Sequence, residues 1–423
     1  MKIGVALAAL AATTSLSAGA QQVVDLPGAD RRLNSDFEEV YRVGSMDGEL
    51  WETFGEIGGT AFDADGNLYV FDRQASRIVV VDPEGNFLRE VGQAGEGPGE
   101  FRMAMNFTVM PDGRVLVADL GHRAYQLFNA DGSFERMLSM GGGDMIRVSG
   151  LSPHPNGTAV VSGGGGMQIS MRSGGPGGEP EPPTTRPIDL VSIEGEDATA
   201  TVIAEGWLPP RGEPTTMEGG GMRFAMSTAG PRTFEPNLLV GVLPNGGIAF
   251  SDSSAYAIKV TGPDGSVERV LRRPFRPTAV TPSIEDSERE RRLEELEAGE
   301  GPQMRVMTAG PGGGAAQSVS QDAIKEMMRN QLAQMQFFPE IPVINNLRSS
   351  WSGRLWVQRR GDEPVSDGPI DVVEAGGNYV GSFPAGATEI PAAFGPGGLA
   401  AYIETDEFDV PSVVVRRLPS AIN

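Results

Sequence analysis

The sequence contains no cysteine and only two histidines, His122 and His154. Without cysteine the chain can form no disulfide bond and can carry no lipid on an N-terminal cysteine. Two histidines also cannot supply a metal site that needs three of them. The folded chain must therefore be held together by its core alone, and 423 residues are ample for that.

Long apolar runs are also missing, because no stretch after the first residues reaches the roughly 20 apolar residues that a membrane helix needs. The first twenty residues have another pattern. Lys2 gives a positive start, residues 3–12 form a short apolar run, and Ala18-Gly19-Ala20 is a small-residue cleavage pattern. We therefore predict a signal peptide over residues 1–20 and one exported domain over residues 21–423, located in the periplasm or outside the cell.

Positive charge is scarce, since 56 acidic residues stand against 34 basic ones and the net charge is −22. Nucleic acids and anionic membranes are bound through lysine and arginine, so this balance argues against both as partners. The acidity fits solubility outside the cell, and a calcium site is the alternative explanation. We expect no cofactor, with calcium as the one alternative.

The main feature that is present is a repeat, with one copy over residues 62–92 and another over residues 109–139. In each copy a turn glycine is followed six residues later by an aspartate and thirteen residues after that by another turn glycine. A third copy with the same spacing lies far downstream. The three triplets are Gly66, Asp72, Gly85; Gly113, Asp119, Gly132; and Gly246, Asp252, Gly265. Repeats of this length indicate an array of supersecondary units.

Each copy is predicted to form four antiparallel strands. In the first copy these cover residues 58–62, 68–71, 77–81 and 87–91, and Asp65-Gly66 is a hairpin signal between the first two. A single sheet of this kind can bury its faces only against neighbouring sheets. A closed ring of sheets buries the faces and leaves few open edges, which is the propeller arrangement.

These motifs resemble the NHL-repeat class of six-bladed β-propellers. The first copy matches through Asp65-Gly66, Asp72, Arg77-Ile78 and Glu84-Gly85, and the second has His122-Arg123 in the polar loop. The linker at residues 95–101 also fits. The resemblance implies an all-β, six-bladed β-propeller of four-stranded antiparallel blades.

The remaining blades are more degenerate. We expect blade three to begin near Met145, blade four to cover residues 238–271, blade five to contain residues 352–357, and blade six to begin near Ala392. Blade six then ends one strand short. The unpartnered segment at residues 38–44 is predicted to close the ring as its outer strand.

Three insertions, at about residues 163–186, 207–235 and 273–342, interrupt the pattern. Each follows a second or a fourth strand, so all three should emerge on the same face of the disc. Glycine-rich parts of the first two, residues 163–186 and 219–231, are predicted to be mobile. The third should contain helices over residues 284–298 and 321–338, of which the second has an apolar stripe. We expect that helix either to cover the channel mouth as a lid or to pack against the flank of a blade.

The strand-end aspartates Asp72, Asp119 and Asp252 should all lie on the inserted face. They could ligate calcium, but an aspartate at a strand end more often accepts hydrogen bonds from its own turn. The carboxylate ring is incomplete, because Arg359 replaces the aspartate in blade five. Aromatic and basic neighbours complete the candidate binding set. The set is Trp51, Asp72, Arg73, Asp119, His122, Arg123, Trp207, Asp252 and Arg359.

No catalytic motif is present, and we predict no catalytic residue. Amidating lyases of the NHL type use three histidines around zinc, which this chain lacks. Lactonases with six blades ligate a metal through Glu, Asn and Asp, for which the candidates are Glu56, Asn106, Asn237 and Asn345. The sequence therefore favours a non-enzymatic exported scaffold, acting as a monomer, that binds a protein, peptide or glycan at the inserted face. The alternative is a metal-dependent hydrolase or lyase, lactonase-like or amidating-lyase-like, at the channel mouth.

Overall fold

The structure is a computed structural model that describes residues 21–140, 145–170, 184–210, 215–219, 222–226, 232–298 and 321–423. The predicted signal peptide lies outside the described residues. Among the described helices none is long and apolar enough to cross a membrane.

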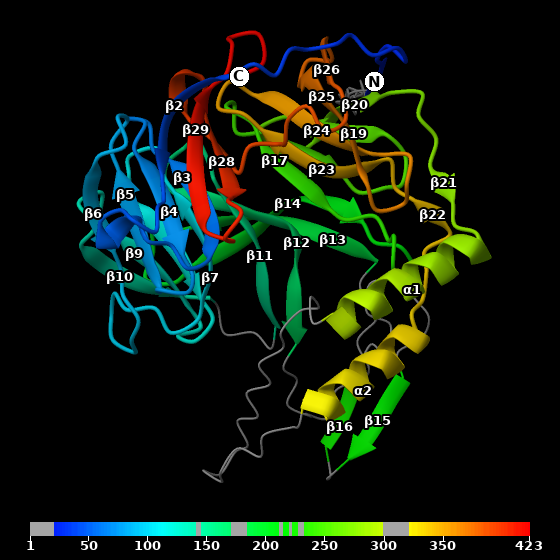
Figure 1. Cartoon of the computed structure of the whole chain (residues 1–423), viewed down its shortest axis with the longest axis horizontal. Coiled ribbons are helices and arrows are strands. Elements are labelled where there is room, and N and C mark those ends of the chain that lie inside the picture. Colours follow the sequence, from blue (N-terminus) through cyan, green and yellow to red (C-terminus); the bar gives the residue numbers. More distant parts are fainter. Residues whose placement is uncertain are drawn as a thin grey trace, which may run out of the picture.

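Six sheets, each with four antiparallel strands and one with an additional edge strand, follow one another around a ring, so the chain is a six-bladed β-propeller, as predicted (Figure 1). The first strands of neighbouring blades contact one another, which places them innermost, around the axis. From the inside outwards, the blades are blade one, β3 (Ile57–Phe62), β4 (Leu68–Asp72), β5 (Arg77–Val81), β6 (Phe87–Val91); blade two, β7 (Ala104–Val109), β8 (Val115–Asp119), β9 (Ala124–Phe128), β10 (Phe134–Ser139); blade three, β11 (Met145–Pro153), β12 (Ala159–Ser170), β13 (Thr185–Ser192), β14 (Thr199–Trp207); blade four, β17 (Leu239–Val242), β18 (Ile248–Ser251), β19 (Ala257–Thr261), β20 (Val267–Arg272); blade five, β23 (Ile344–Ser349), β24 (Arg354–Arg360), β25 (Asp367–Glu374), β26 (Tyr379–Phe383); and blade six, β27 (Ala393–Phe394), β28 (Leu399–Thr405), β29 (Pro411–Arg417), β2 (Glu38–Val43).

The ring closes through β2, which comes from the N-terminal part of the chain. It pairs antiparallel with β29, from Glu38 opposite Arg417 to Val43 opposite Val413. Blade six therefore takes three strands from the C-terminal end and its outer strand from the N-terminal end. This pairing covers the edge that β29 would otherwise present to solvent.

A strand that the sequence analysis did not anticipate precedes β2. β1 (Gln22–Asp25) pairs parallel with β20 and makes blade four five-stranded. The chain then runs from Leu26, whose N–H donates to Arg272 O, past blade five, where Leu33 N–H donates to Ser382 O. We call residues 22–36 the strap, because they join blade four to blade six across the outside of blade five.

The core is divided into one apolar cluster for each pair of neighbouring blades. Between blades one and two, for example, Tyr69 and Ile78 pack with Val117 and Phe128, all almost fully buried. Between blades four and five, Ile258 and Leu271 pack with Leu355 and Val373. Both faces of each middle strand are buried, which explains why β4, β5, β8 and β9 read as continuous apolar runs.

The repeated glycines have a backbone reason. The six glycines of the repeat triplets all adopt a left-handed conformation, with φ between 79° and 88°. Each lies in a tight turn between strands, where a side chain would be strained. The spacing found in the sequence is therefore the spacing of the hairpin turns.

The antiparallel order puts the connections after second and fourth strands on one face of the ring, which we call the inserted face. The opposite face carries the hairpins between first and second strands, and we call it the hairpin face.

The prediction of a glycine-rich loop that begins at Gly163 is wrong for residues 163–170. β12 continues to Ser170, which pairs with Met145 at the start of β11. Strand pairing across the backbone tolerates the glycines there, and residues 171–183 lie outside the described residues.

The second insertion contains a hairpin, β15 (Thr215–Gly219) with β16 (Met222–Met226), and the third contains α1 (Pro282–Ala298) and α2 (Gln321–Ala333). The two helices lie side by side in Figure 1, at one side of the ring rather than over its centre. A small apolar cluster of Phe234, Phe338 and Ile341 joins the two insertions. Two short strands, β21 (Thr278–Ala279) and β22 (Glu340–Ile341), pair beside it.

We expect Leu332→Glu to loosen α2 from α1, because Leu332 is partly buried on a helix whose main contacts are with α1. Placing a charge there should cost the helix pair about 1–3 kcal/mol. Limited proteolysis should then cut within residues 273–342 faster, while the melting temperature of the propeller stays close to that of the wild type. Gln331→Glu adds the same charge at an exposed neighbour and is the control. Equal cleavage of the two variants would contradict the assignment of the buried side.

Candidate functional site

The three strand-end aspartates are buried and accept hydrogen bonds, two of them from the chain that leads into their own blades. Asp72 is buried and accepts hydrogen bonds from the N–H groups of Gly55 and Glu56, each at 3.4 Å, and of Ala75 at 3.1 Å. Its carboxylate also lies 3.8 Å from Arg77 Nε. These partners are the ones expected for a carboxylate that holds a turn and an entering strand.

Asp252, in blade four, has one donor at the end of blade three and one in its own blade. It accepts from Trp207 N–H and from Lys259 Nζ, both at 2.6 Å, and it is 2% exposed. Asp119 accepts from the N–H groups of Arg102 and Met103, both at 2.9 Å, and is fully buried. The lone pairs of all three carboxylates are therefore directed to neighbouring backbone and side-chain donors.

His122 is held between two acceptors. Nδ1 lies 2.8 Å from Asp119 Oδ2, and Nε2 lies 3.0 Å from the carbonyl oxygen of Glu96. A carbonyl can only accept, so the doubly protonated imidazolium is the form that satisfies both contacts. Burial lowers the pKa of His122, but the hydrogen bonds to Asp119 and Glu96 outweigh it, and the net pKa is raised. His122 therefore pins the linker near Glu96 to blade two.

This contact gives a pH-dependent prediction. Because the pKa of His122 is raised on folding, its stabilising contribution is complete below the unfolded value of about 6.5 and is lost as the pH rises through the folded value. Burial raises the pKa of Asp119, but N–H donors and His122 hold it below its ordinary value, so the Asp119 contribution is lost only in acid. We expect His122→Gln to cost about 2 kcal/mol near pH 6 and less at higher pH, as measured by urea unfolding.

His154→Gln is the control for that measurement, since His154 pairs with no carboxylate among the described residues and its ring contacts Gly246 O. A cost for His122→Gln that is the same at pH 6 and pH 9 would contradict the imidazolium assignment.

The other predicted site residues also have structural partners. Arg73 pairs with Glu56 at 2.9 Å on the inserted face, and Arg123 adopts a left-handed turn with φ 53°. Trp51 lies with its ring centroid 5.3 Å from that of Phe87. Trp207 packs edge-on against Phe338 at 6.4 Å, and 40% of it stays exposed. Of the two tryptophans in the predicted set, Trp207 is the more exposed; Arg73 and Arg123 are exposed as well.

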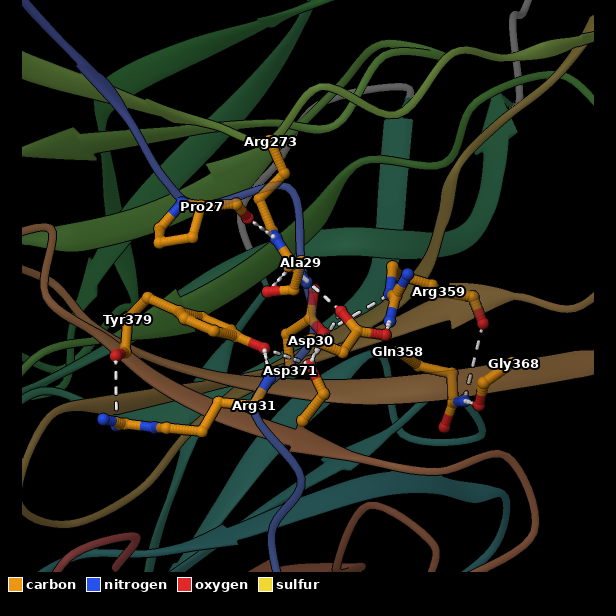
Figure 2. A network of polar contacts seen from close by, with 11 residues as sticks. Pro27, Ala29, Asp30, Arg31, Arg273, Gln358, Arg359, Gly368, Asp371 and Tyr379 are labelled. Atoms are coloured by element: carbon orange, nitrogen blue, oxygen red, sulfur yellow. Dashed lines mark hydrogen bonds and ion pairs between the residues drawn. The ribbon is translucent and has the colours of Figure 1, made fainter.

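Arg359 belongs to a network of four charged side chains, three of them buried, which Figure 2 shows. Its Nη2 lies 2.6 Å from Asp30 Oδ2 and its Nε 3.3 Å from Asp371 Oδ1. Arg273 makes the matching pairs, at 2.9 Å to Asp30 Oδ1 and 2.9 Å to Asp371 Oδ2. We call these four residues the charge clamp. Two arginines and two aspartates make it electrically neutral.

The charge clamp connects three parts of the chain. Asp30 comes from the strap, Arg273 follows β20 in blade four, and Arg359 and Asp371 come from β24 and β25 in blade five. Arg273 also donates to the carbonyl of Pro27 at 2.8 Å, and its guanidinium lies 4.5 Å from the ring of Tyr379. Ser382 donates to Asp371 from β26. The arrangement is suited to holding the strap against blades four and five.

Buried charge at the clamp changes the ionisation of its neighbours. Burial and the charge of Asp371 raise the pKa of Tyr256, which keeps the phenol protonated. Burial lowers the pKa of Arg273, but Asp371 and Asp30 outweigh it and raise the net value. For Asp30 burial raises the pKa, and the hydrogen bonds from Arg359 and Arg273 bring it below its ordinary value.

Within the described part of the chain, no group of three or more His, Cys, Asp or Glu side chains could hold a metal ion. Three of the four candidates for a lactonase-like metal site have other contacts, and the fourth, Asn237, is exposed. Glu56 pairs with Arg73, Asn345 donates to Asp367 at 2.6 Å, and Asn106 accepts from Phe107 N–H at 2.9 Å. Calcium binding remains a prediction that these contacts do not support.

Exposed apolar side chains, by contrast, gather on the inserted face. Leu50 and Met46, in the connection from β2 to β3, are 92% and 69% exposed, and Phe408, between β28 and β29, is 76% exposed. Every other member ends or follows a second or fourth strand, or lies at the start of a first strand. We call the set the rim residues: Met46, Leu50, Met103, Met105, Trp207, Val365 and Phe408.

The sequence comparisons agree with the fold. A family described as a 6-bladed beta-propeller, DUF5128, matches residues 54–140, which are blades one and two. No curated protein matches the chain. Membership of the NHL-repeat class in particular stays a prediction.

Solved structures of low sequence identity also resemble the chain. A candidate exported protein from Bacteroides fragilis has 10% identity and a TM-score of 0.49, with 94% of this chain and 100% of that chain covered. A DUF4221 family member from Bacteroides vulgatus has 11% identity and a TM-score of 0.47, covering 90% and 98%. Virginiamycin B lyase from Staphylococcus aureus has 10% identity and a TM-score of 0.38, covering 88% and 87%. Similarities this remote carry no argument about ligand or activity.

Proposed function

We propose that this chain is an exported, monomeric β-propeller that binds a polypeptide segment at its inserted face. Of the ligand classes considered from the sequence, a protein or peptide fits this face better than a glycan, because the available side chains are mainly aliphatic, thioether and phenyl groups. The proposal includes export, which the residues of the N-terminal segment support.

The observation that carries the proposal is the distribution of exposed large apolar side chains. Seven of the thirteen are rim residues, on loop connections or at the adjoining strand ends of the inserted face, and Leu293 on α1 belongs to an insertion on the same face. The other five are Trp351 on the hairpin face and, along outer strands, Val23 on β1, Phe87 and Leu88 on β6, and Val202 on β14. Apolar side chains gathered on one face of a soluble protein mark an interaction site.

Four of the polar candidate residues are engaged within the protein, which also favours an apolar binding surface. Asp72, Asp119 and Asp252 are buried and accept from nearby donors within the ring, and Arg359 is 7% exposed within the charge clamp. A ligand approaching the inserted face would meet loop tips rather than these charges. Affinity should therefore come from apolar burial, with Trp207 and Phe408 as aromatic anchors.

The alternative of a metal-dependent hydrolase or lyase is not favoured by any described contact. Three of its four candidates, Glu56, Asn106 and Asn345, are already hydrogen-bonded or ion-paired, as described above. We propose the binding role without a catalytic residue.

The test is selection of linear 12-residue peptides from a random library against the folded wild-type protein. Peptides that saturate binding are then measured against Leu50→Ser and Phe408→Ser. We expect each variant to weaken binding about tenfold or more, the effect of losing one large apolar contact. Trp351→Ser, which removes an exposed aromatic on the hairpin face, is the matched control and should bind normally.

The proposal is overturned if no peptide binds saturably. It is also overturned if the selected peptides lose affinity with Trp351→Ser and keep it with both rim variants.

A further inference from the structure

The innermost strands have an unusual charge composition. β3, β7, β17 and β27 contain no charged residue, β11 contains Arg147, and β23 contains Arg348. None of the six strands has an aspartate or glutamate, in a chain with 56 acidic and 34 basic residues. The six first strands therefore have a positive formal charge, whereas the net charge of the chain is strongly negative.

Arg348 lies on the inner ring of first strands. It lies on β23, the first strand of blade five, and its Nη1 donates to the carbonyl of Ala392, just before the first strand of blade six. The guanidinium thus bridges the inner strands of two neighbouring blades. The residue is nevertheless exposed.

Arg348 has no carboxylate partner among the described residues. Most other described arginines do, as Arg273, Arg354 and Arg416 illustrate. Desolvation by neighbouring atoms lowers the pKa of Arg348, while the residue keeps an exposed surface. An exposed cation without a counter-ion can attract an anion from solution.

A second polar side chain shares the same face of the strand. Asn346 is two residues before Arg348, the register is regular between them, and both are exposed. Residues at i and i+2 of a strand point the same way. An amide and a planar guanidinium side by side offer several N–H donors to the oxygens of one ligand.

We propose that the axis of the ring holds an oxyanion, a carboxylate or phosphate group, bound by Arg348 with Asn346 as a second donor. The rim residues play no part in this site, so the inference does not rest on the proposed peptide-binding function. The net negative charge of the protein would repel most free anions. The six first strands, which contain no Asp or Glu, would accept an anion that fits between them.

The test is titration of wild-type protein with citrate, inorganic phosphate and chloride at constant ionic strength, followed by calorimetry and by the ¹⁵Nε resonance of Arg348. We expect either citrate or phosphate to bind saturably at one site and to shift that resonance, and chloride to give no saturable shift. The two oxyanions distinguish a carboxylate ligand from a phosphate ligand.

Variants then test the residues. Arg348→Gln should weaken the oxyanion at least about tenfold, as expected for loss of a charged hydrogen bond. Arg348→Lys should recover part of the affinity, and Asn346→Ala should weaken binding less than Arg348→Gln. Arg417→Gln is the matched control, because Arg417 also donates to a backbone carbonyl, that of Gly397, and has no carboxylate partner among the described residues. It should bind like the wild type.

The inference is overturned if neither oxyanion saturates the wild type, or if Arg348→Gln binds as tightly as Arg417→Gln. The resonance of Arg348 in the wild type keeps the test decisive even if a variant folds poorly. An unshifted signal at saturating citrate and phosphate would also overturn it.

Discussion

Asp371→Asn is expected to lower the free energy of unfolding by about 3–5 kcal/mol, the cost of removing one partner from a buried ion pair. Asp371 and Arg273 are both fully buried, 2.9 Å apart, and Arg359 lies 3.3 Å from the other carboxylate oxygen. Asparagine keeps the shape of the side chain but leaves two buried guanidinium groups with Asp30 alone. Urea unfolding should show a lower midpoint with an unchanged slope.

Asp30→Asn is the control within the same network. Its side chain is 40% exposed, so solvent screens its ion pairs, and we expect a cost of about 1 kcal/mol. The pKa of Asp30 is lowered in the folded chain, so its contribution is present above the ordinary value of about 4 and disappears as the pH falls through the folded value. The difference between wild type and Asp30→Asn should therefore shrink in acid. Equal costs for Asp371→Asn and Asp30→Asn at neutral pH would contradict the charge clamp as described.

Removal of residues 21–44 is expected to abolish the monomeric fold. The deletion takes away β2, exposes the hydrogen-bonding edge of β29, and removes Val43 from the cluster between blades six and one. An exposed strand edge next to an opened apolar cluster pairs with other chains. Light scattering and size-exclusion chromatography should show aggregation, with a large loss of melting temperature.

Two shorter truncations distinguish the effect of losing β2 from the effect of losing the strap. Starting the chain at Gln21 should leave stability unchanged. Starting it after Ser35 removes β1 and Asp30 but keeps β2, so the protein should be less stable and still monomeric. A monomer with the wild-type melting temperature after removal of residues 21–44 would mean that β2 is not needed to close the ring.

The regular part of the fold could be predicted from local sequence patterns. Gly66, Gly113 and Gly246 mark hairpins that require a left-handed residue, and the aspartates that follow them end strands whose turns need an acceptor. Each signal lies within one blade, where spacing along the chain reflects spacing in the structure. The same locality made the hydrogen-bonding role of the strand-end aspartates the favoured expectation.

The charge clamp could not be predicted in the same way. Asp30 is separated from Arg359 by 329 residues, and no local sequence pattern indicates that the strap brings Asp30 next to Arg359. One signal was available, because Asp371 interrupts an apolar strand whose neighbours Ile370 and Val372 are buried. A carboxylate at such a position needs a buried cation, but its identity depends on the tertiary fold. The extension of β12 through glycines was missed because composition alone favoured a loop.

Hydrogen exchange with and without a selected peptide tests the proposed binding face most directly. The account predicts protection in the connections that carry the rim residues, above all residues 44–53, 361–366 and 406–410, with the hairpins at residues 63–67 and 350–353 unchanged. Protection confined to those hairpins, with the rim connections exchanging as in the free protein, would contradict it.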